Sequence, residues 1–93
     1  MLWYVYILES LKDHNLYVGL TNNLKNRIKQ HNNRKVFSTK NRVPFKVIFC
    51  EVHCNKYDAA RREQFLKSGW GKNWIRKTLN NYFRESKSKK LGG

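Results

Sequence analysis

Three short apolar segments of the chain carry the pattern of β-strands. Residues 3–8 and 16–20 are rich in β-branched and aromatic side chains, and the polar stretch between them contains turn formers. This arrangement predicts an antiparallel hairpin. Residues 45–52 have the same character and follow Pro44, which suits the entrance of a strand but not its interior. We therefore expect a third strand and a minimal sheet.

The polar segment after the hairpin has the spacing of an amphipathic helix. Thr21 is a residue type that caps helices, and Leu24 and Ile28 lie four residues apart, so their side chains share one face. We expect this first helix over about residues 22–32.

Two further helices are predicted after the third strand. The first begins after Asn55 as its cap and ends near Ser68, where Gly69 stops it. The second spans about residues 72–84, because its apolar side chains recur at helical spacing and form one stripe. The stripe consists of Trp74, Ile75, Leu79, Tyr82 and Phe83.

These elements predict an α+β fold, a small three-stranded antiparallel sheet flanked by about three helices. The chain has 93 residues, of which 40% are hydrophobic, and so short a chain cannot form two separate cores. We expect a single domain over residues 1–84. The remaining segment, residues 85–93, is basic and rich in small residues, so we expect a flexible tail.

The charge of the chain adds a prediction about its partner. Twenty Lys and Arg stand against six Asp and Glu, a formal net charge of +14, which strains a compact fold by self-repulsion unless a polyanion lies nearby. Nucleic acid is the expected partner, and an anionic membrane surface is a weaker alternative. Lys40 and Arg42 in the basic loop before the third strand, together with Lys67, are candidates for contacts with its backbone.

The apolar N-terminal residues 1–8 resemble a strand more than a signal peptide. They lack a positive leading region, a long apolar run and a small-residue cleavage site. No stretch is long enough to span a bilayer. We expect a soluble protein located in the cytoplasm.

Cys50, His53 and Cys54 raise the alternative of a structural zinc site. Such a site needs at least one more ligand at suitable spacing, and His14 or His31 would have to supply it. If residues 45–52 form a strand, Cys50 points to one face and His53 to the other, which favours Cys50 as a small core residue.

Two tyrosines, Tyr6 and Tyr17, lie one on each strand of the predicted hairpin. Cross-strand neighbours approach closely, so the hairpin can present two phenols together. The ordinary alternative is that each ring packs in the core with its hydroxyl at the rim.

The first predicted helix and the second each carry polar residues suited to phosphate chemistry. Arg27 and His31 share one face of the first helix, where a guanidinium can hold a phosphate oxygen and an imidazole can exchange a proton near neutral pH. Glu63 lies among basic residues of the second helix and is a candidate metal ligand. The alternatives are a solvated helix face and an ion pair between Glu63 and Lys67, four residues apart.

Taken together, these segments resemble the GIY-YIG nuclease family, and the short stand-alone bacterial members most of all. The namesake tripeptides correspond to Tyr4-Val5-Tyr6 and Tyr17-Val18-Gly19, the family's arginine and histidine helix to LKNRIKQHNN, and its glutamate segment to DAARREQFLKSGWG. The segment STK-x-R-x-P-F-K before the third strand is similar as well. The resemblance runs from about Trp3 to Phe83.

Two departures from the family pattern are visible. Tyr4 stands where the first tripeptide has glycine, and valine replaces isoleucine in both tripeptides, although both phenols remain. Many members also carry an asparagine after the glutamate helix. Asn73 and Asn80 are both possible here, so that role stays unassigned.

The resemblance implies a metal-dependent endonuclease acting on nucleic acid, with DNA expected over RNA, in repair or processing. It implies that Glu63 holds one divalent cation, Mg²⁺ or Mn²⁺, and that Arg27 neutralises the phosphate. Tyr6 is the candidate general base, with a phenol made more acidic by nearby cations, and Tyr17 shares this task. His31 then orients a phenol or relays its proton. The alternative is a DNA- or RNA-binding module that keeps the fold and basic surface without turnover.

Overall fold

The computed structural model describes the backbone of residues 1–92 and the side chains of residues 1–86. The chain divides into two compact units, the N-terminal unit (Met1–Glu63) and the C-terminal unit (Gln64–Gly93). The elements follow in the order β1 (Trp3–Ser10), β2 (Leu16–Thr21), α1 (Leu24–Asn32), β3 (Phe45–His53), α2 (Lys56–Lys67), α3 (Gly69–Thr78) and α4 (Asn80–Gly92).

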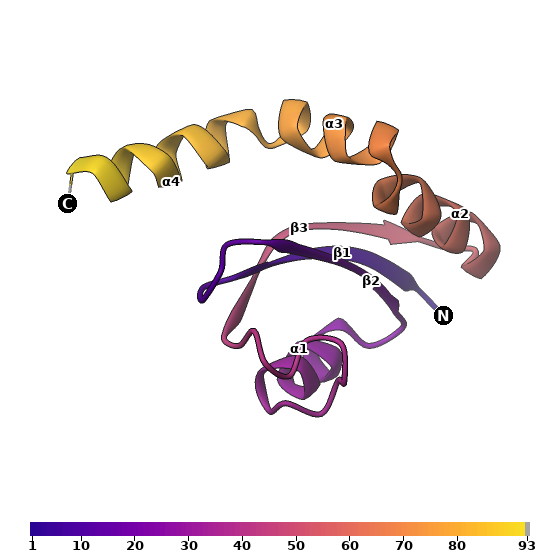
Figure 1. Cartoon of the computed structure of the whole chain (residues 1–93). Helices are drawn as coiled ribbons and strands as arrows, with labels where there is room; N and C mark the ends of the chain where they lie inside the picture. The colour runs from indigo at the N-terminus through magenta and orange to yellow at the C-terminus, as the bar shows by residue number, and fades with distance from the viewer. Residues whose placement is uncertain (93) are drawn as a thin grey trace. The chain divides into compact units, whose positions relative to one another are not determined.

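A three-stranded antiparallel sheet with strand order β2-β1-β3 forms the centre of the N-terminal unit (Figure 1). The expected α+β fold and the hairpin of β1 and β2 are confirmed. Because β1 pairs on both sides, its residues 5–10 are buried, and the side chains alternate between the two faces of the sheet.

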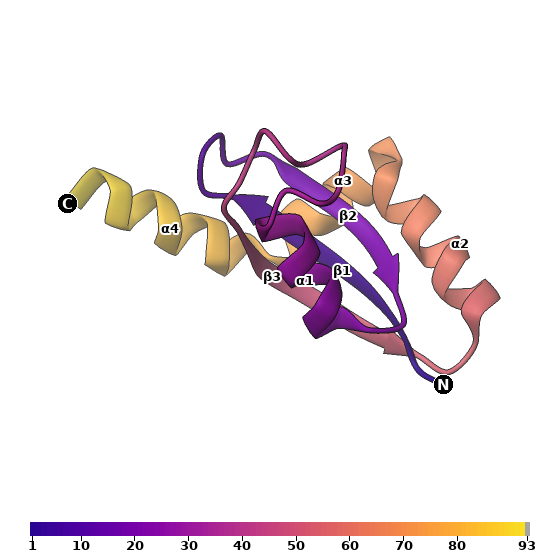
Figure 2. The same ribbon diagram turned by 90° about the horizontal axis from the view of Figure 1, so that it is seen from below.

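One face of the sheet is covered by α1, which Figure 2 shows lying over the strands. Leu24 and Ile28 of α1 pack against a cluster formed by Tyr6, Leu8 and Phe45. The shared face expected for Leu24 and Ile28 is therefore confirmed. The same packing brings Tyr6 of β1 next to His31 of α1.

The cap expected for α1 is wrong by two residues. Thr21 still pairs with Tyr4 in the β1–β2 ladder, so it cannot begin the helix. Asn23 is the N-cap, and its side-chain oxygen accepts a hydrogen bond of 3.1 Å from the backbone N–H of Asn26. The cap expected for α2 is confirmed, because the side chain of Asn55 accepts hydrogen bonds from the N–H groups two and three residues later.

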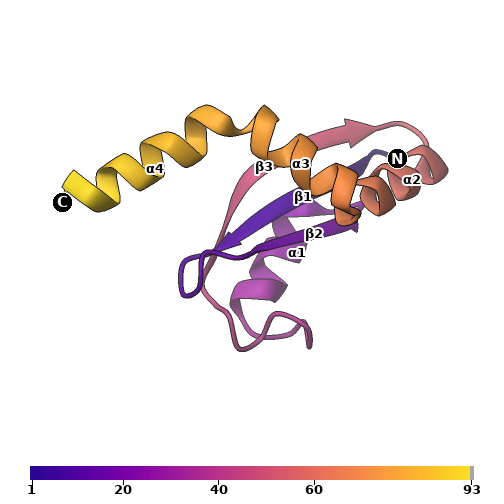
Figure 3. The same cartoon turned by 45° about the horizontal axis from the view of Figure 1, so that its top comes forward.

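Residues 33–44 form the loop that leads from α1 into β3 (Figure 3). The side chain of Asn32 closes this loop, because its Oδ1 accepts from the N–H of Phe45 at 2.7 Å and its Nδ2 donates to the Phe45 carbonyl at 3.2 Å. The hydroxyl of Ser10 donates to the carbonyl of Arg42 at 2.6 Å. These hydrogen bonds therefore attach the C-terminal end of the loop to the sheet.

Gly69 does not stop α2 through a left-handed conformation, because no glycine among the described residues has a positive φ. Ser68 ends the helix instead and caps α3, its hydroxyl accepting from the N–H of Gly71 at 3.2 Å. A Cβ atom on Gly71 would overlap the backbone of Phe65 and Leu66. This glycine therefore permits the close approach of α3 to the end of α2 within the C-terminal unit.

The helix expected over residues 72–84 is in fact two helices, α3 and α4, separated at Leu79. Thr78 and Asn80 flank the break, and both residue types have low helix propensity. The backbone of residues 85–92 continues in α4, whereas the side chains of residues 87–93 lie outside the described part. The division into a domain of residues 1–84 and a flexible tail of residues 85–93 stays a prediction.

Among the described residues, no helix has both the length and the apolar character required to cross a membrane. The cytoplasmic location expected from the sequence stays a prediction.

Candidate functional site

Both tyrosines of the hairpin point to the face of the sheet that α1 covers. Tyr6 shares that face of β1 with Leu8, and Tyr17 on β2 is the antiparallel partner of Leu8. The two rings are 6.4 Å apart between centroids, and Tyr6 is 1% exposed. The sequence correctly predicts that the phenols meet, although they are diagonal neighbours and not direct partners.

The direct partner of Tyr6 across the hairpin is Gly19. A Cβ atom at this position would lie 2.3 Å from both Cζ and the hydroxyl oxygen of Tyr6. The phenol therefore lies across the space that any side chain at position 19 would fill. Sequence reasoning gave Gly19 no role, although the tripeptide Tyr17-Val18-Gly19 that contains it was the available signal.

The hydroxyl of Tyr6 forms a buried hydrogen bond of 2.9 Å with Nε2 of His31. His31 is fully buried, and its Nδ1 lies 2.8 Å from the hydroxyl of Thr39, which is also fully buried. The ring of Tyr17 meets the imidazole edge to face at 5.0 Å. Thr39 was missed as a site residue, although it lies within the recognised segment STK.

The hydrogen-bond network assigns the tautomer of His31. The Thr39 hydroxyl donates toward the carbonyl of Val36 at 3.5 Å, so its oxygen accepts from Nδ1–H of His31. Nε2 then has a free lone pair and accepts from the hydroxyl of Tyr6. Burial lowers the pKa of His31 to about 4, with a further lowering by the charge of Arg27, so the imidazole is neutral at pH 7.

Arg27 lies half-buried on α1, and its Nη1 donates to Oε1 of Gln30 at 2.9 Å. Its guanidinium also lowers the pKa of Tyr6 through a hydrogen bond and its charge, yet burial of the phenol outweighs this effect and raises the pKa to about 12. The acidified phenol expected from the sequence is therefore not found in the protein alone. Desolvation of the buried ring favours the neutral hydroxyl.

Glu63 lies half-buried on α2, and its carboxylate is close enough to Tyr6 to raise the pKa of the phenol further. Arg27 and Glu63 thus act on the same hydroxyl with opposite signs. A carboxylate oxygen is the ligand type that Mg²⁺ and Mn²⁺ prefer. The position of the Glu63 carboxylate beside the Tyr6 phenol fits the metal-binding role that the sequence suggested.

The residues expected to bind the nucleic-acid backbone lie in different surroundings. Lys40 is half-buried, with Nζ 4.7 Å from the centroid of the Phe37 ring. Arg42 forms an ion pair of 3.0 Å with Asp13, and its buried Nη2 has no hydrogen-bond partner among the described residues. This arrangement favours a structural role for Arg42. Lys67 is exposed at the end of α2.

The two asparagines considered for an assisting role, Asn73 in α3 and Asn80 at the start of α4, are both exposed in the C-terminal unit. The assisting role stays unassigned.

The residues of the zinc alternative point in different directions. Cys50 is half-buried and packs against the Tyr6 cluster, whereas Cys54 is exposed. Nε2 of His53 instead forms a hydrogen bond of 3.1 Å with Oε1 of Glu51. Within the described part of the chain, no three His, Cys, Asp or Glu side chains are grouped to hold a metal. The expectation that Cys50 is a core residue agrees with this packing.

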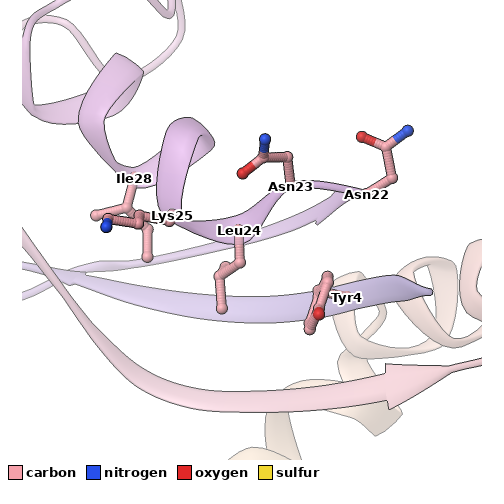
Figure 4. A pocket seen from close by; sticks show the side chains of 6 residues that line it. All are labelled: Tyr4, Asn22, Asn23, Leu24, Lys25 and Ile28. Atoms are coloured by element: carbon pink, nitrogen blue, oxygen red, sulfur yellow. The ribbon is translucent and has the colours of Figure 1, made fainter. Parts of the chain in front are cut away.

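Tyr4, which stands where the family tripeptide has glycine, lines a pocket of about 540 Å³ beside the site (Figure 4). Leu24 and Ile28 border this pocket from α1, and Asn22 and Asn23 border it from the segment before the helix. The substitution at position 4 thus changes the wall of a pocket and leaves the Tyr6 phenol in place.

We predict that Gly19→Ala displaces the Tyr6 ring, because the new methyl group and the phenol cannot occupy the same space. Overpacking of this kind costs about 1–3 kcal/mol of unfolding free energy. Gly69→Ala is the matched control, since nothing lies within 4 Å of a Cβ atom there. Urea denaturation of both variants checks this, and equal stability of the two would contradict the proposed packing of Tyr6 on Gly19.

We also predict that buried His31 makes stability fall as the pH is lowered. Between pH 6.5 and about 4 the unfolded chain binds a proton at His31 that the folded chain does not. The loss should be about 3 kcal/mol across that window and should level off below it. Urea denaturation from pH 7 to 4 for the parent and His31→Gln measures the effect. The same pH slope in both proteins would show that the imidazole is not buried neutral.

Comparisons with known proteins identify the family. The model of the GIY-YIG catalytic domain matches residues 2–80. A UPF0213 protein of Clostridium perfringens is 48% identical over 65 residues, covering 69% of each chain, and the UPF0213 protein YazA of Bacillus subtilis is 35% identical over 80 residues, covering 85% of this chain and 76% of YazA.

A solved structure supports the same conclusion. The solution NMR structure of the UPF0213 protein BH0048 from Bacillus halodurans has 34% sequence identity and a TM-score of 0.54, and the match covers 84% of this chain and 85% of that one. Residues 2–80, which the family model matches, contain both tyrosine tripeptides, α1 and Glu63. The chain belongs to the GIY-YIG family.

Proposed function

We propose that this chain is an endonuclease that hydrolyses phosphodiester bonds of nucleic acid with the help of one divalent cation, Mg²⁺ or Mn²⁺. The observation that carries the proposal is the convergence of Arg27, His31, Tyr17 and Glu63 on the hydroxyl of Tyr6. These side chains come from two helices, α1 and α2, and from both strands of the hairpin, so no local sequence effect explains their meeting. DNA is the proposed substrate over RNA, in repair or processing.

Arg27 is proposed to bind a non-bridging phosphate oxygen. A guanidinium stays charged under all working conditions and can donate two parallel hydrogen bonds to a phosphate. Its half-buried position beside Tyr6 strengthens such a contact, because partial exclusion of water reduces screening. The bound phosphate would then lie within reach of the phenol.

Tyr6 and His31 are proposed to remove the proton of the attacking water together. The water passes a proton to the Tyr6 oxygen while the Tyr6 hydroxyl proton moves to Nε2 of His31, and the new P–O bond forms as the bond to the leaving oxygen breaks. Burial raises the pKa of Tyr6 and lowers that of His31, so both groups favour their neutral forms and a separate phenolate–imidazolium pair is unfavourable. The two transfers are therefore proposed to be concerted.

Glu63 is proposed to hold the divalent cation. Mg²⁺ keeps several waters and commonly binds through one or two carboxylates together with substrate phosphates, so a single protein carboxylate is sufficient. When bound, the cation supplies positive charge to the non-bridging and leaving oxygens. The same charge would oppose the effect of Glu63 on Tyr6 and would make the phenol more acidic.

A second candidate function is nucleic-acid binding without turnover, which the net charge of +14 favours equally well. Binding alone gives no reason for a buried Tyr6–His31 pair beside Arg27 and Glu63. The two candidates differ in whether the hydroxyl of Tyr6 and the carboxylate of Glu63 are needed for cleavage.

We predict that Tyr6→Phe lowers the rate of cleavage by about 10²- to 10⁴-fold, the contribution that a positioned acid or base makes. The ring that fills the core is retained, so the variant should fold, with a loss of about 1–3 kcal/mol because Nε2 of buried His31 loses its partner. Tyr57→Phe, at a tyrosine that is 77% exposed, is the control. Unchanged cleavage by folded Tyr6→Phe would remove Tyr6 from the reaction.

We predict that Glu63→Gln abolishes metal-dependent cleavage and leaves nucleic-acid binding intact or slightly stronger. The variant loses the carboxylate ligand and one negative charge from a basic region. Glu85→Gln makes the same charge change at an exposed position of α4 and should cleave as the parent does. Cleavage is measured in Mg²⁺ and Mn²⁺, binding in chelator, and folding by thermal melting. Near-parental cleavage by folded Glu63→Gln would contradict the metal assignment.

A further inference from the structure

Phe37, on the loop of residues 33–44, is 84% exposed. A single exposed apolar residue is common on protein surfaces and means little by itself. Phe37 differs in its surroundings from Tyr57 and Trp70, which are similarly exposed. It is attached on one side to the hydrogen-bond network of the candidate site, and its ring lies beside a lysine.

A rigid turn presents the ring. The N–H of Thr39 donates to the carbonyl of Val36 at 3.1 Å, so Phe37 and Ser38 are the two central residues of a hydrogen-bonded turn. Val36 is 9% exposed and Thr39 fully buried, while the two residues between them are exposed. The turn is therefore anchored at both ends and projects its tip into solvent.

The same turn is connected directly to the Tyr6–His31 pair. Thr39 is the hydrogen-bond partner of His31 at 2.8 Å, and His31 is the partner of Tyr6 at 2.9 Å. Phe37 is two residues from Thr39, so their Cα atoms are separated by at most about 7 Å. The exposed ring is thus carried by the same turn that supplies the hydrogen-bond partner of His31, within the N-terminal unit.

The charge around Phe37 indicates a polyanionic ligand. The ammonium of Lys40 lies over one face of the ring at 4.7 Å, and Arg34 and Lys35 precede it on the same loop. A cation on one face leaves the other face to solvent, which agrees with the high exposure of the side chain. Aromatic rings interleaved with basic residues are the arrangement that binds unpaired nucleic-acid bases.

We propose that Phe37 is a stacking platform for an unpaired base of the strand whose phosphate lies at Tyr6, with Lys40 contacting the adjoining backbone. This inference rests on the nucleic-acid binding of the proposed function and adds the substrate class. The faces of a base inside a duplex are covered by its neighbours, so only an unpaired or terminal base can stack on the ring. The preferred substrate therefore carries single-stranded nucleotides at the site of cleavage.

The test measures binding in chelator, so that its result does not depend on cleavage. Parent, Phe37→Leu and Phe37→Trp are titrated with a single-stranded oligonucleotide and with a blunt duplex of the same sequence. Leucine keeps an apolar side chain without a π face, and tryptophan enlarges the face. Tyr57→Leu is the matched control, because it removes an aromatic ring of similar exposure that lies outside the turn.

The proposal predicts that Phe37→Leu binds the single strand about five- to a hundredfold more weakly, the loss of one base–aromatic stack. Duplex binding should change less than twofold, Phe37→Trp should bind the single strand at least as tightly as the parent, and Tyr57→Leu should match the parent. A fluorescent adenine analogue in the single strand should be quenched by the parent and less by Phe37→Leu, because quenching reports stacking on the ring.

Three results would overturn the proposal. Unchanged binding of the single strand by Phe37→Leu shows that the ring does not stack, and equal weakening for single strand and duplex shows only a disturbed loop. A concentration-dependent dimer that is lost in Phe37→Leu, measured by sedimentation, assigns the ring to contact between copies of this chain. If the parent fails to cleave while Phe37 still controls single-strand binding, the nuclease assignment fails and the platform stands.

Discussion

The hydrogen bond between the hydroxyl of Tyr6 and Nε2 of His31 lies in the core of the N-terminal unit, where His31 is fully buried and Tyr6 is 1% exposed. Gly19 makes it possible, because any side chain there would occupy the place of the phenol. Thr39 completes it by accepting from the other imidazole nitrogen, which also fixes the loop that carries Phe37 and Lys40. Breaking this bond leaves the buried Nε2 of His31 without a partner, which costs about 1–3 kcal/mol.

The electrostatics of the site follow from this burial. Desolvation raises the pKa of Tyr6 and lowers that of His31, so both are neutral at pH 7 and the proton stays on the phenol. Arg27 and Glu63 act on the hydroxyl with opposite signs. In the proposed reaction, phosphate at Arg27 and a cation at Glu63 change this balance, so the proton moves only when substrate and metal are both present.

Much of the fold follows from local pattern, whereas the site depends on register. The strands and the shared face of Leu24 and Ile28 were predictable, because alternation and four-residue spacing are local properties. The pairing of Tyr6 with Gly19 was not predictable, because it depends on the register between β1 and β2, which the local pattern of each strand does not define. In the protein alone the pKa of Tyr6 is raised and not lowered, because burial is a tertiary property that outweighs a neighbouring charge. The break at Leu79 was hidden by a continuous apolar stripe.

The most direct test of this account is the protonation state of His31, followed by nitrogen NMR of protein with labelled histidine. The account predicts a neutral imidazole at neutral pH, protonated at Nδ1 toward Thr39 and unprotonated at Nε2, where it accepts from Tyr6. The Nε2 resonance should shift in Tyr6→Phe, because that nitrogen loses its donor. An imidazolium, or a proton on Nε2, would contradict the direction of the hydrogen bond and the proton transfer built on it.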